Sequence, residues 1–440
     1  MATLIMAGQF FLSISILVVL HEMGHFIPAR LFGTRVEKFY LFFDPWFSLF
    51  KKKIGDTEYG IGWLPLGGYV KISGMIDESF DKEQMEQPEQ PWEFRAKPAW
   101  QRLIIMLGGV TVNFILGFFI FGIMLWQYGE EYLPAQNATA GIYVDTLGME
   151  LGLRDGDKIL KVGDKPFEIF NDRKVVQEIS IENARTITVE RDGKETVVPI
   201  GSEWANKLIM HKNKDKSLFG PRLPFVVDQV IEGQPAEKAG FQKGDAMLSI
   251  NGKPAKYFHE FAKEARKHKK EKIEVLALRA SDTISLTVTT TKKGTIGLAP
   301  VGFETERKTY SLGQAMPLGV SRGLNFIGVQ LKAFKQMFTG KIDAKESLGG
   351  FASIGKMFGA QWNWERFWRM TAILSLILGF MNLLPIPALD GGYVMFLLFE
   401  VVTGIKPSDK TLEVANTIGF LLILGLLIFA NGLDIFRMFQ

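Results

Sequence analysis

The stretch LIMAGQFFLSISILVVLHEMGH, residues 4–25, joins an uncharged apolar run to a metal-binding pattern. The run Leu4–Leu20 carries no ionisable side chain and continues directly into His21. A helix needs about 20 apolar residues to cross the hydrocarbon core of a bilayer. No Lys or Arg precedes the run and no small-residue cleavage site follows it, so we predict a retained membrane span rather than a signal peptide.

The pattern His21-Glu22-Met23-Gly24-His25 is the strongest indication of chemistry in the sequence. On a helix, residues four apart share one face, so both imidazoles can bind one Zn²⁺ while Glu22 acts as the base on a bound water. Ionisable side chains at membrane depth are costly and are functional by default. We interpret the motif as a catalytic zinc site. The alternative is a polar helix end that merely reaches the cytoplasm.

Three further uncharged runs predict additional membrane helices: Leu103–Trp126, Met370–Leu389 and Val414–Leu433. Apolar residues make up 47% of the 440-residue chain and charged residues 22%, which fits a membrane core joined to soluble parts. The net charge of +4 is too small to indicate a nucleic-acid partner. The absence of cysteine excludes disulfides, thiolate ligands and cysteine nucleophiles. Gly391–Val402 is apolar but too short to span, and is expected at the interface or packed inside.

The positive charges predict the orientation. The segment between the first two apolar runs is rich in them, at Arg30, Arg35, Lys38, Lys51, Lys52, Lys53, Arg95, Lys97 and Arg102. By the positive-inside rule this segment is cytoplasmic, so the region 127–369 and both termini are expected outside. Arg366 and Arg369, just before the third run, oppose this orientation weakly.

The region 127–369 contains an internal repeat. Residues 152–160, GLRDGDKIL, reappear 88 positions later (152 to 240) as GFQKGDAML, and Lys165-Pro166 and Arg191 recur as Lys253-Pro254 and Arg279. An ungapped match over this length predicts two copies of one small α+β domain. The pattern closely resembles the PDZ domains of bacterial proteases, which bind extended peptides by strand addition. The alternative is two β-rich spacers that act by bulk alone.

Two other segments are expected to contact the membrane. Residues 311–368 include an amphipathic pattern that predicts a helix on the outer membrane surface or, alternatively, packed against the spans. Glu58–Ile72 alternates apolar and small residues around Pro65-Leu66-Gly67-Gly68, which predicts a β-hairpin. Its apolar side chains favour a hairpin that dips toward the membrane over a soluble cap. Its edge, with Gly67, Gly68 and Tyr69, is the candidate surface for binding a substrate strand.

The third zinc ligand is expected to be a carboxylate. A catalytic zinc commonly has three protein ligands, and the remaining histidines, His211, His259 and His268, lie in the region predicted outside. The first and third spans are predicted to run in the same direction, which brings Asp390 to the depth of His21. Asp44 and Glu400 are weaker candidates, and a plain turn role for Asp390 before two glycines stays open.

Residues 382–392, NLLPIPALDGG, together with HExxH in the first span, resemble the N-x-x-P-x-P-x-L-D-G signature of the site-2 protease family. The repeat and residues 67–71, GGYVK, narrow the resemblance to its bacterial regulator of sigma-E group. This resemblance implies one Zn²⁺ per chain held by His21, His25 and Asp390, with Glu22 as catalytic base. Two positions depart from the family pattern, since Val110 and Phe351 stand where Pro is usual.

The resemblance also implies a place and a substrate class. It implies regulated intramembrane proteolysis in the bacterial inner membrane, with the PDZ pair in the periplasm. The implied substrates are single-span anti-sigma factors already trimmed outside, and remnant signal peptides. From its chemistry, Asn382 is expected to donate a hydrogen bond to the substrate backbone or oxyanion. The PDZ pair is expected to exclude bulky substrates, with capture of new C-termini as the alternative.

The predicted fold is a membrane α-helical core of four transmembrane helices with a cytoplasmic-side β-hairpin and two tandem PDZ-like α+β domains. The expected divisions are 1–32 (first helix), 33–102 (cytoplasmic loop), 103–126 (second helix), 127–220 and 221–308 (PDZ-like domains), 309–369 (membrane-surface segment), 370–389 (third helix), 390–413 (cytoplasmic-side segment) and 414–440 (fourth helix and C-terminus). Two other functions fit the sequence less well: a membrane scaffold with a structural metal, which does not need Glu22, and a metal transporter, in which the spans would repeat.

Overall fold

The computed structural model describes residues 2–65, 67–75, 87–210, 213, 216–343, 345 and 349–438. Leu66 of the predicted hairpin and His211 lie outside these residues. The chain forms two compact units. The first contains Met1–Gly129, Thr309–Leu331 and Leu348–Gln440, and the second contains Glu130–Lys308 and Lys332–Ser347.

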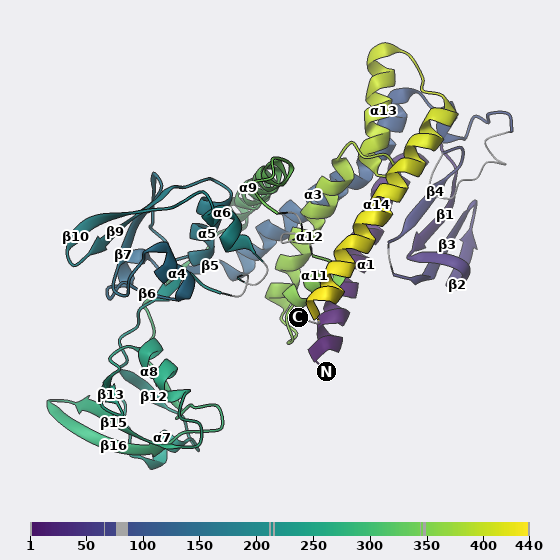
Figure 1. Ribbon diagram of the computed structural model, residues 1–440. Coiled ribbons are helices and arrows are strands. Elements are labelled where there is room, and N and C mark those ends of the chain that lie inside the picture. The colour runs from purple at the N-terminus through teal and green to yellow at the C-terminus, as the bar shows by residue number, and fades with distance from the viewer. Residues whose placement is uncertain are drawn as a thin grey trace. The chain divides into compact units, whose positions relative to one another are not determined.

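Helices dominate the first unit. Around the central helix α3 pack α1, α12 and α13, as Figure 1 shows. Small residues permit the close approach of α1 and α3, because a Cβ added to Gly24 would lie 2.5 Å from the Gly108 carbonyl oxygen. The helices are α1 (Ala2–Leu31), α3 (Ala99–Tyr128), α9 (Leu312–Phe338), α11 (Phe351–Met357), α12 (Trp364–Leu383), α13 (Asp390–Thr403) and α14 (Asp409–Met438), with a 3₁₀ turn at Phe94–Ala96.

Three helices in the described part of the chain are long and apolar enough to cross a membrane, namely Ala2–Leu31, Ala99–Tyr128 and Lys410–Arg437. The predicted third span, Met370–Leu389, is helical only as far as Leu383. Pro385 and Pro387 explain the early end, because a residue before proline avoids the helical conformation and proline lacks a backbone donor. Leu384 is accordingly extended. Gly391–Val402 lies within α13, which buries Tyr393, Val394 and Leu397 on one face and exposes Met395, Leu398, Phe399, Val401 and Val402.

A four-stranded sheet in the first unit corrects the predicted hairpin. Strands β3 (Thr57–Leu64) and β4 (Tyr69–Ile72) do form where alternation placed them, but they are not paired with each other. The order is β2-β3-β1-β4, with β1 (Val36–Leu41) parallel to β3 and antiparallel to β4. The hairpin is instead β2 (Phe43–Ile54) with β3. Local alternation reveals strands but not a partner from earlier in the chain.

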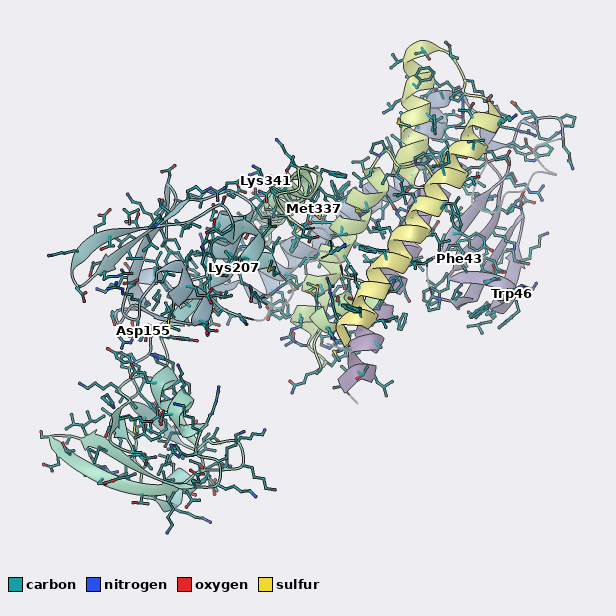
Figure 2. All side chains as sticks on the ribbon, viewed as in Figure 1. Phe43, Trp46, Asp155, Lys207, Met337 and Lys341 are labelled. Carbon is teal, nitrogen blue, oxygen red and sulfur yellow. The ribbon has the colours of Figure 1, made fainter. Side chains whose placement is uncertain are left out.

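The outer strand β2 exposes an aromatic surface. Trp46 is 90% exposed, and Phe47 and Phe50 are more than half exposed. Trp63 of β3 stacks on both Trp46 and Phe47. Figure 2 labels Trp46 and Phe43 on this sheet. Apolar surface of this kind marks a membrane or protein contact rather than a water-facing sheet.

The predicted surface helix is α9, and part of it packs against the membrane helices. Ala315, Gly319 and Gly323 recur every four residues and are buried. A Cβ on Gly319 would lie 2.4 Å from the backbone nitrogen of Gly122 in α3. This small-residue contact favours the packed alternative for residues 312–331.

The second unit contains two copies of one topology. The sheets have the orders β10-β9-β7-β8 and β14-β13-β15-β16, and each copy adds a two-stranded ladder, β11-β6 or β12-β17. Each copy also closes its own hydrophobic core.

The first copy contains β6 (Ile142–Val144), α4 (Thr146–Leu151), β7 (Lys158–Val162), β8 (Lys165–Pro166), α5 (Asp172–Ser180), β9 (Thr186–Arg191), β10 (Lys194–Pro199), α6 (Trp204–Ile209) and β11 (Phe219–Pro221). The second contains β12 (Val227–Val230), α7 (Pro235–Lys238), β13 (Ala246–Ile250), β14 (Lys253–Pro254), α8 (Phe258–Ala265), β15 (Lys272–Arg279), β16 (Asp282–Thr289) and β17 (Leu298–Pro300). Strands β5 (Glu130–Tyr132) and β18 (Glu306–Lys308) pair where the chain enters and leaves this region.

The repeated Asp and Arg form the same ion pair in both copies. Arg191 donates from Nε and Nη2 to the two carboxylate oxygens of Asp157, each at 2.8 Å. Arg279 does the same to Asp245 at 2.7 and 2.8 Å. The repeat in the sequence is therefore a repeat of a specific buried interaction.

Candidate metal centre

Three donor groups from two helices converge in the first unit. His21 and His25 lie one turn apart on α1, and Asp390 is the first residue of α13. Asp390 Oδ2 lies 3.4 Å from His21 Nε2 and 3.3 Å from His25 Nε2, and the two Nε2 atoms are 3.4 Å apart. A tetrahedral zinc with bonds of about 2.0–2.1 Å separates its donors by about 3.3–3.4 Å. The three atoms therefore have the spacing of one face of a zinc tetrahedron.

Burial supports the same fit. His21 and His25 are 8% and 7% exposed, and Asp390 Oδ2 is buried without a hydrogen-bond donor. A buried carboxylate oxygen with no donor is costly unless a cation satisfies it. Among the described residues, no other group of three His, Cys, Asp or Glu residues has its donor atoms close enough to hold a metal.

The other ring nitrogens of the two histidines are occupied, which leaves both Nε2 atoms for a metal. His25 Nδ1 lies 2.9 Å from the backbone carbonyl oxygen of Ile105 and donates to it. His21 Nδ1 lies 2.9 Å from the side-chain amide of Asn113. An amide can be turned so that its oxygen faces the ring N–H, so Asn113 fits as the acceptor that fixes the metal-binding tautomer.

Asn113 and Gly109 form the α3 wall of the centre, and sequence reasoning did not assign either to it. Asn113 is fully buried, and a Cβ on Gly109 would lie 2.3 Å from His25 Nε2 and 2.7 Å from the His21 ring. The available indication was an asparagine in an uncharged span, one helical turn after a glycine. A polar residue at membrane depth needs a partner, and here that partner is the candidate ligand His21.

Glu22 lies between the metal centre and the sheet. It follows His21 on α1, and its carboxylate lies near the backbone of Val70 on β4. A Cβ on Gly68 would lie 2.5 Å from Val18 and 3.5 Å from Glu22 Cγ, so Gly68 allows the strand to approach the helix. Of the predicted hairpin residues, Gly68 is therefore beside the candidate base.

Asn382 lies at the centre, one residue before the end of α12. Its Nδ2 is 3.2 Å from His21 Nε2. After α12 the chain turns through Pro385 and Pro387 into α13. A Cβ on Gly391 would lie 2.2 Å from the Leu384 carbonyl oxygen, so the turn that presents Asp390 leaves no room for a side chain there.

The other predicted residues are engaged elsewhere. Tyr69 donates to Asp44 Oδ1 at 2.8 Å, and Ser48 donates to Asp44 Oδ2 at 3.0 Å. Burial and the bond to Asp44 raise the pKa of Tyr69, which keeps its phenol neutral. Glu400, the other weak ligand candidate, forms an ion pair with Arg102. Neither carboxylate joins the metal centre.

Gly67 and the two described histidines expected outside, His259 and His268, are the remaining predicted residues. Gly67 adopts a φ of +154° beside the Phe43 ring. His259 and His268 belong to the second unit.

Comparison with known proteins agrees with this chemistry. A model of peptidase family M50 matches residues 9–426. A regulator of sigma E protease from Haemophilus influenzae is 27% identical over 469 aligned positions, and the protease RseP of Yersinia pestis is 28% identical over 472. A putative zinc metalloprotease of Neisseria meningitidis is 28% identical over 454. Each alignment covers 98% of both chains. The chain belongs to peptidase family M50 and is a zinc metalloprotease with membrane helices.

Proposed function

We propose that this protein is an intramembrane zinc endopeptidase that cleaves single-span membrane proteins, with His21, His25 and Asp390 as ligands and Glu22 as catalytic base. The observation that carries the proposal is the convergence of three metal-spaced donors beside Glu22 on a helix able to cross a membrane. Zinc-dependent proteolysis within the membrane requires a metal, a base and water at one depth, and these residues would hold the metal and supply the base.

The residues of the centre divide the chemistry. Zinc bound here would lower the pKa of a bound water toward about 7 and polarise the scissile carbonyl. Glu22 takes the proton of the attacking water and transfers it to the leaving amine. Asn382, placed beside His21, donates a hydrogen bond to the carbonyl oxygen as negative charge develops on it. Asn113 and the Ile105 carbonyl hold the two imidazoles in the required tautomer.

Substrate binding is proposed to use the edge strand β4. A helical substrate hides its carbonyl groups in its own hydrogen bonds and must be unwound. Among described residues β4 pairs only with β1, so its other edge can accept an added strand. Val70 on this strand lies near Glu22, so a strand added there would pass the base. The exposed aromatic residues of β2 support a sheet that dips into the membrane.

The topology is proposed to include α12 as a fourth span. Its 20 residues are about 30 Å long, which matches the hydrocarbon thickness. Together with the charge distribution, this supports a sheet on the cytoplasmic side and repeats, as PDZ domains, in the periplasm of a bacterial inner membrane. The relatives named for sigma E regulation support anti-sigma-factor-like substrates, and remnant signal peptides are a second substrate class.

The direct test compares proteolysis by the wild-type protein and a Glu22→Gln variant. A tagged single-span substrate is incubated with each, with and without a zinc chelator, and zinc content is measured in parallel. Glu22→Gln keeps the shape and the ligands but removes the proton acceptor, so zinc should remain while cleavage stops. Appreciable cleavage by Glu22→Gln would refute the mechanism. A scaffold with a structural metal would show no cleavage in either protein.

The two repeats are proposed to act as a size gate for the active site. Because β5 and β18 pair at the base of the repeat region, residues 133–305 can be replaced by a short Gly-Ser linker between Tyr132 and Glu306. Under gating, this deletion should admit untrimmed substrates with bulky outside domains. Under the alternative, capture of new C-termini, it should slow cleavage of trimmed substrates. Unchanged cleavage of both would refute gating and capture alike.

A further inference from the structure

The loop that carries Asp390 has a constrained backbone. Ala388, two residues before the ligand, has a φ of +72°, in the left-handed region that non-glycine residues avoid. Such a conformation persists only where the surroundings hold it. The loop is also closed in by Gly392, on which a Cβ would lie 2.6 Å from the Ile386 carbonyl oxygen.

Helix α14 supplies part of what holds this loop. Asn416 is 6% exposed, and its Oδ1 accepts a hydrogen bond from the backbone N–H of Ala388 at 3.3 Å. Three residues later, Gly419 contacts the same loop so closely that a Cβ there would lie 1.8 Å from the Pro387 carbonyl oxygen. Asn416 and Gly419 lie on one face of the helix, so both hold residues 387–388 from one side.

This contact is notable because α14 is otherwise little buried. Only 11% of its most apolar window is buried, compared with 28% for α1 and 39% for α3. A second polar attachment lies near its far end, where Asn431 and Asp434 accept hydrogen bonds from the backbone N–H groups of Phe351 and Ser353 at the start of α11. A helix with so little packing elsewhere has a tight, glycine-dependent contact at the metal loop.

We propose that Asn416 and Gly419 are positioning residues for the metal ligand Asp390, so that the last helix completes the zinc centre without contributing a ligand. The inference rests on the proposed metal centre. Asn416 fixes the direction of the Ala388 peptide, and Gly419 sets how close α14 and the loop approach. Together they determine where the Asp390 carboxylate stands relative to His21 and His25. Outer residues that orient a ligand typically change metal affinity about 10–100-fold when replaced.

The test measures zinc affinity of the purified full chain by competition with a chelator, so it does not depend on activity. Asn416→Leu removes the acceptor and should raise the zinc dissociation constant about 10–100-fold. Asn416→Asp keeps an oxygen acceptor and should restore most of the affinity. Thr417→Val is the matched control, because Thr417 is exposed and its hydroxyl bonds to the Glu413 carbonyl of the same helix. It should bind zinc as the wild type does.

A second pair of variants uses the glycines of α14. Gly419→Ala introduces the clash with Pro387, whereas Gly425→Ala makes the same change on the same helix where a Cβ would meet nothing within 4 Å. We expect weaker zinc binding only for Gly419→Ala. The melting temperature of each zinc-free variant separates positioning from general stability, because positioning predicts lost affinity without a matching loss of zinc-free stability.

His25→Ala, measured in parallel, distinguishes a failure of the proposed metal centre from a failure of the role proposed for α14. If His25→Ala keeps its zinc, the proposed metal centre itself is wrong. If it loses zinc while Asn416→Leu and Gly419→Ala bind as tightly as wild type, only the role of α14 is overturned. Equal losses in the Thr417→Val and Gly425→Ala controls would also overturn it. Should Asn416→Leu fail to fold, the comparison of the two glycine variants decides.

Discussion

Buried carboxylates in the two units of this protein have opposite surroundings. In the repeats, Asp157 and Asp245 each accept two hydrogen bonds from one arginine and a third from a backbone N–H three residues earlier, that of Arg154 or Gln242. In the first unit, Asp390 Oδ2 is buried, has no hydrogen-bond donor and faces two histidine nitrogens. The protein itself supplies the hydrogen-bond donors for Asp157 and Asp245, whereas the buried oxygen of Asp390 needs a cation.

The presence or absence of hydrogen-bond donors therefore distinguishes a structural carboxylate from a candidate metal ligand more clearly than burial alone does. An unsatisfied buried oxygen costs about 1–3 kcal/mol, and a metal ion bound at Asp390 would offset that cost. A paired carboxylate holds its surroundings together, and removing one partner leaves an uncompensated charge. We therefore expect Asp390 variants to lose the metal and keep the fold, and Asp157 or Asp245 variants to do the reverse.

The largest expected effect is at Asp390. Asp390→Ala should lose zinc and proteolysis almost completely, as His25→Ala should, because two donors cannot hold the ion in this geometry. Asp44→Ala is the matched control, since both oxygens of Asp44 are bonded to Tyr69 and Ser48. Zinc is measured in the purified proteins. Full zinc occupancy in Asp390→Ala would assign the third ligand elsewhere.

The structural role of the repeat carboxylates is tested by breaking one Asp–Arg ion pair at a time. We call these pairs, Asp157–Arg191 and Asp245–Arg279, the two clamps. Because the chain has no cysteine, one introduced thiol reports opening of one repeat. Ile159→Cys and Met247→Cys place it at equivalent buried positions of the two copies. In the Ile159→Cys background, Asp157→Asn should lower the free energy of opening by about 3 kcal/mol and so speed thiol labelling more than 100-fold. Zinc content should not change.

The two clamps should differ in strength. The Arg191 side chain is 17% exposed and that of Arg279 is 32% exposed, so water replaces the second arginine's bonds more easily. Asp245→Asn in the Met247→Cys background should therefore accelerate labelling less than Asp157→Asn does in the first repeat. Each substitution should leave the other repeat's thiol protected. Coupled opening of both would show that the two copies are one cooperative unit.

The sequence predicted what local spacing determines. Residues four apart on a helix share a face, so His21 and His25 could be paired, and the common direction of two spans placed Asp390 near them. The 88-residue offset predicted equivalent positions for Asp157 and Asp245. Sequence similarity to the M50 family then agrees with the assigned enzyme class.

The sequence did not predict what depends on distant partners. The insertion of β1 between β3 and β4 depends on pairing across the sheet, which local alternation does not encode. Asn113 and Asn416 stand in apolar runs, and their neighbours in space, His21 and Ala388, give them a role that the sequence did not assign. The end of α12 at Leu383 could have been predicted from Pro385 and Pro387, although hydropathy alone extended the apolar run to Leu389.

The smallest expected effect is the pH dependence of the second repeat. Burial alone would raise the pKa of Asp245, but the hydrogen bonds from Arg279 and from the Gln242 backbone outweigh it and lower that pKa below its usual value. Unfolded aspartate has a pKa of about 3.9. The stabilisation from Asp245 is therefore complete above that pH and is lost as the pH falls through the lower, folded-state pKa. Above about pH 5 the clamp should contribute no pH dependence.

Thiol labelling of Met247→Cys between about pH 5 and pH 2 tests this, using a dipyridyl disulfide that reacts with thiols in acid. Labelling should accelerate toward low pH by less than it does on removing the clamp, because protonation of Asp245 is incomplete over most of this range. Lys269→Cys, at an exposed position, corrects for the reagent's own pH dependence.

Hydrogen bonds from Lys253 and Lys267 lower the pKa of Glu264 to about 2, so Glu264→Gln must be combined with each variant to remove its titration. If Asp245→Asn with Glu264→Gln shows the same acid acceleration as Glu264→Gln alone, the clamp is not the source of the pH dependence. The acid sensitivity of the second repeat would then come from other titrating groups.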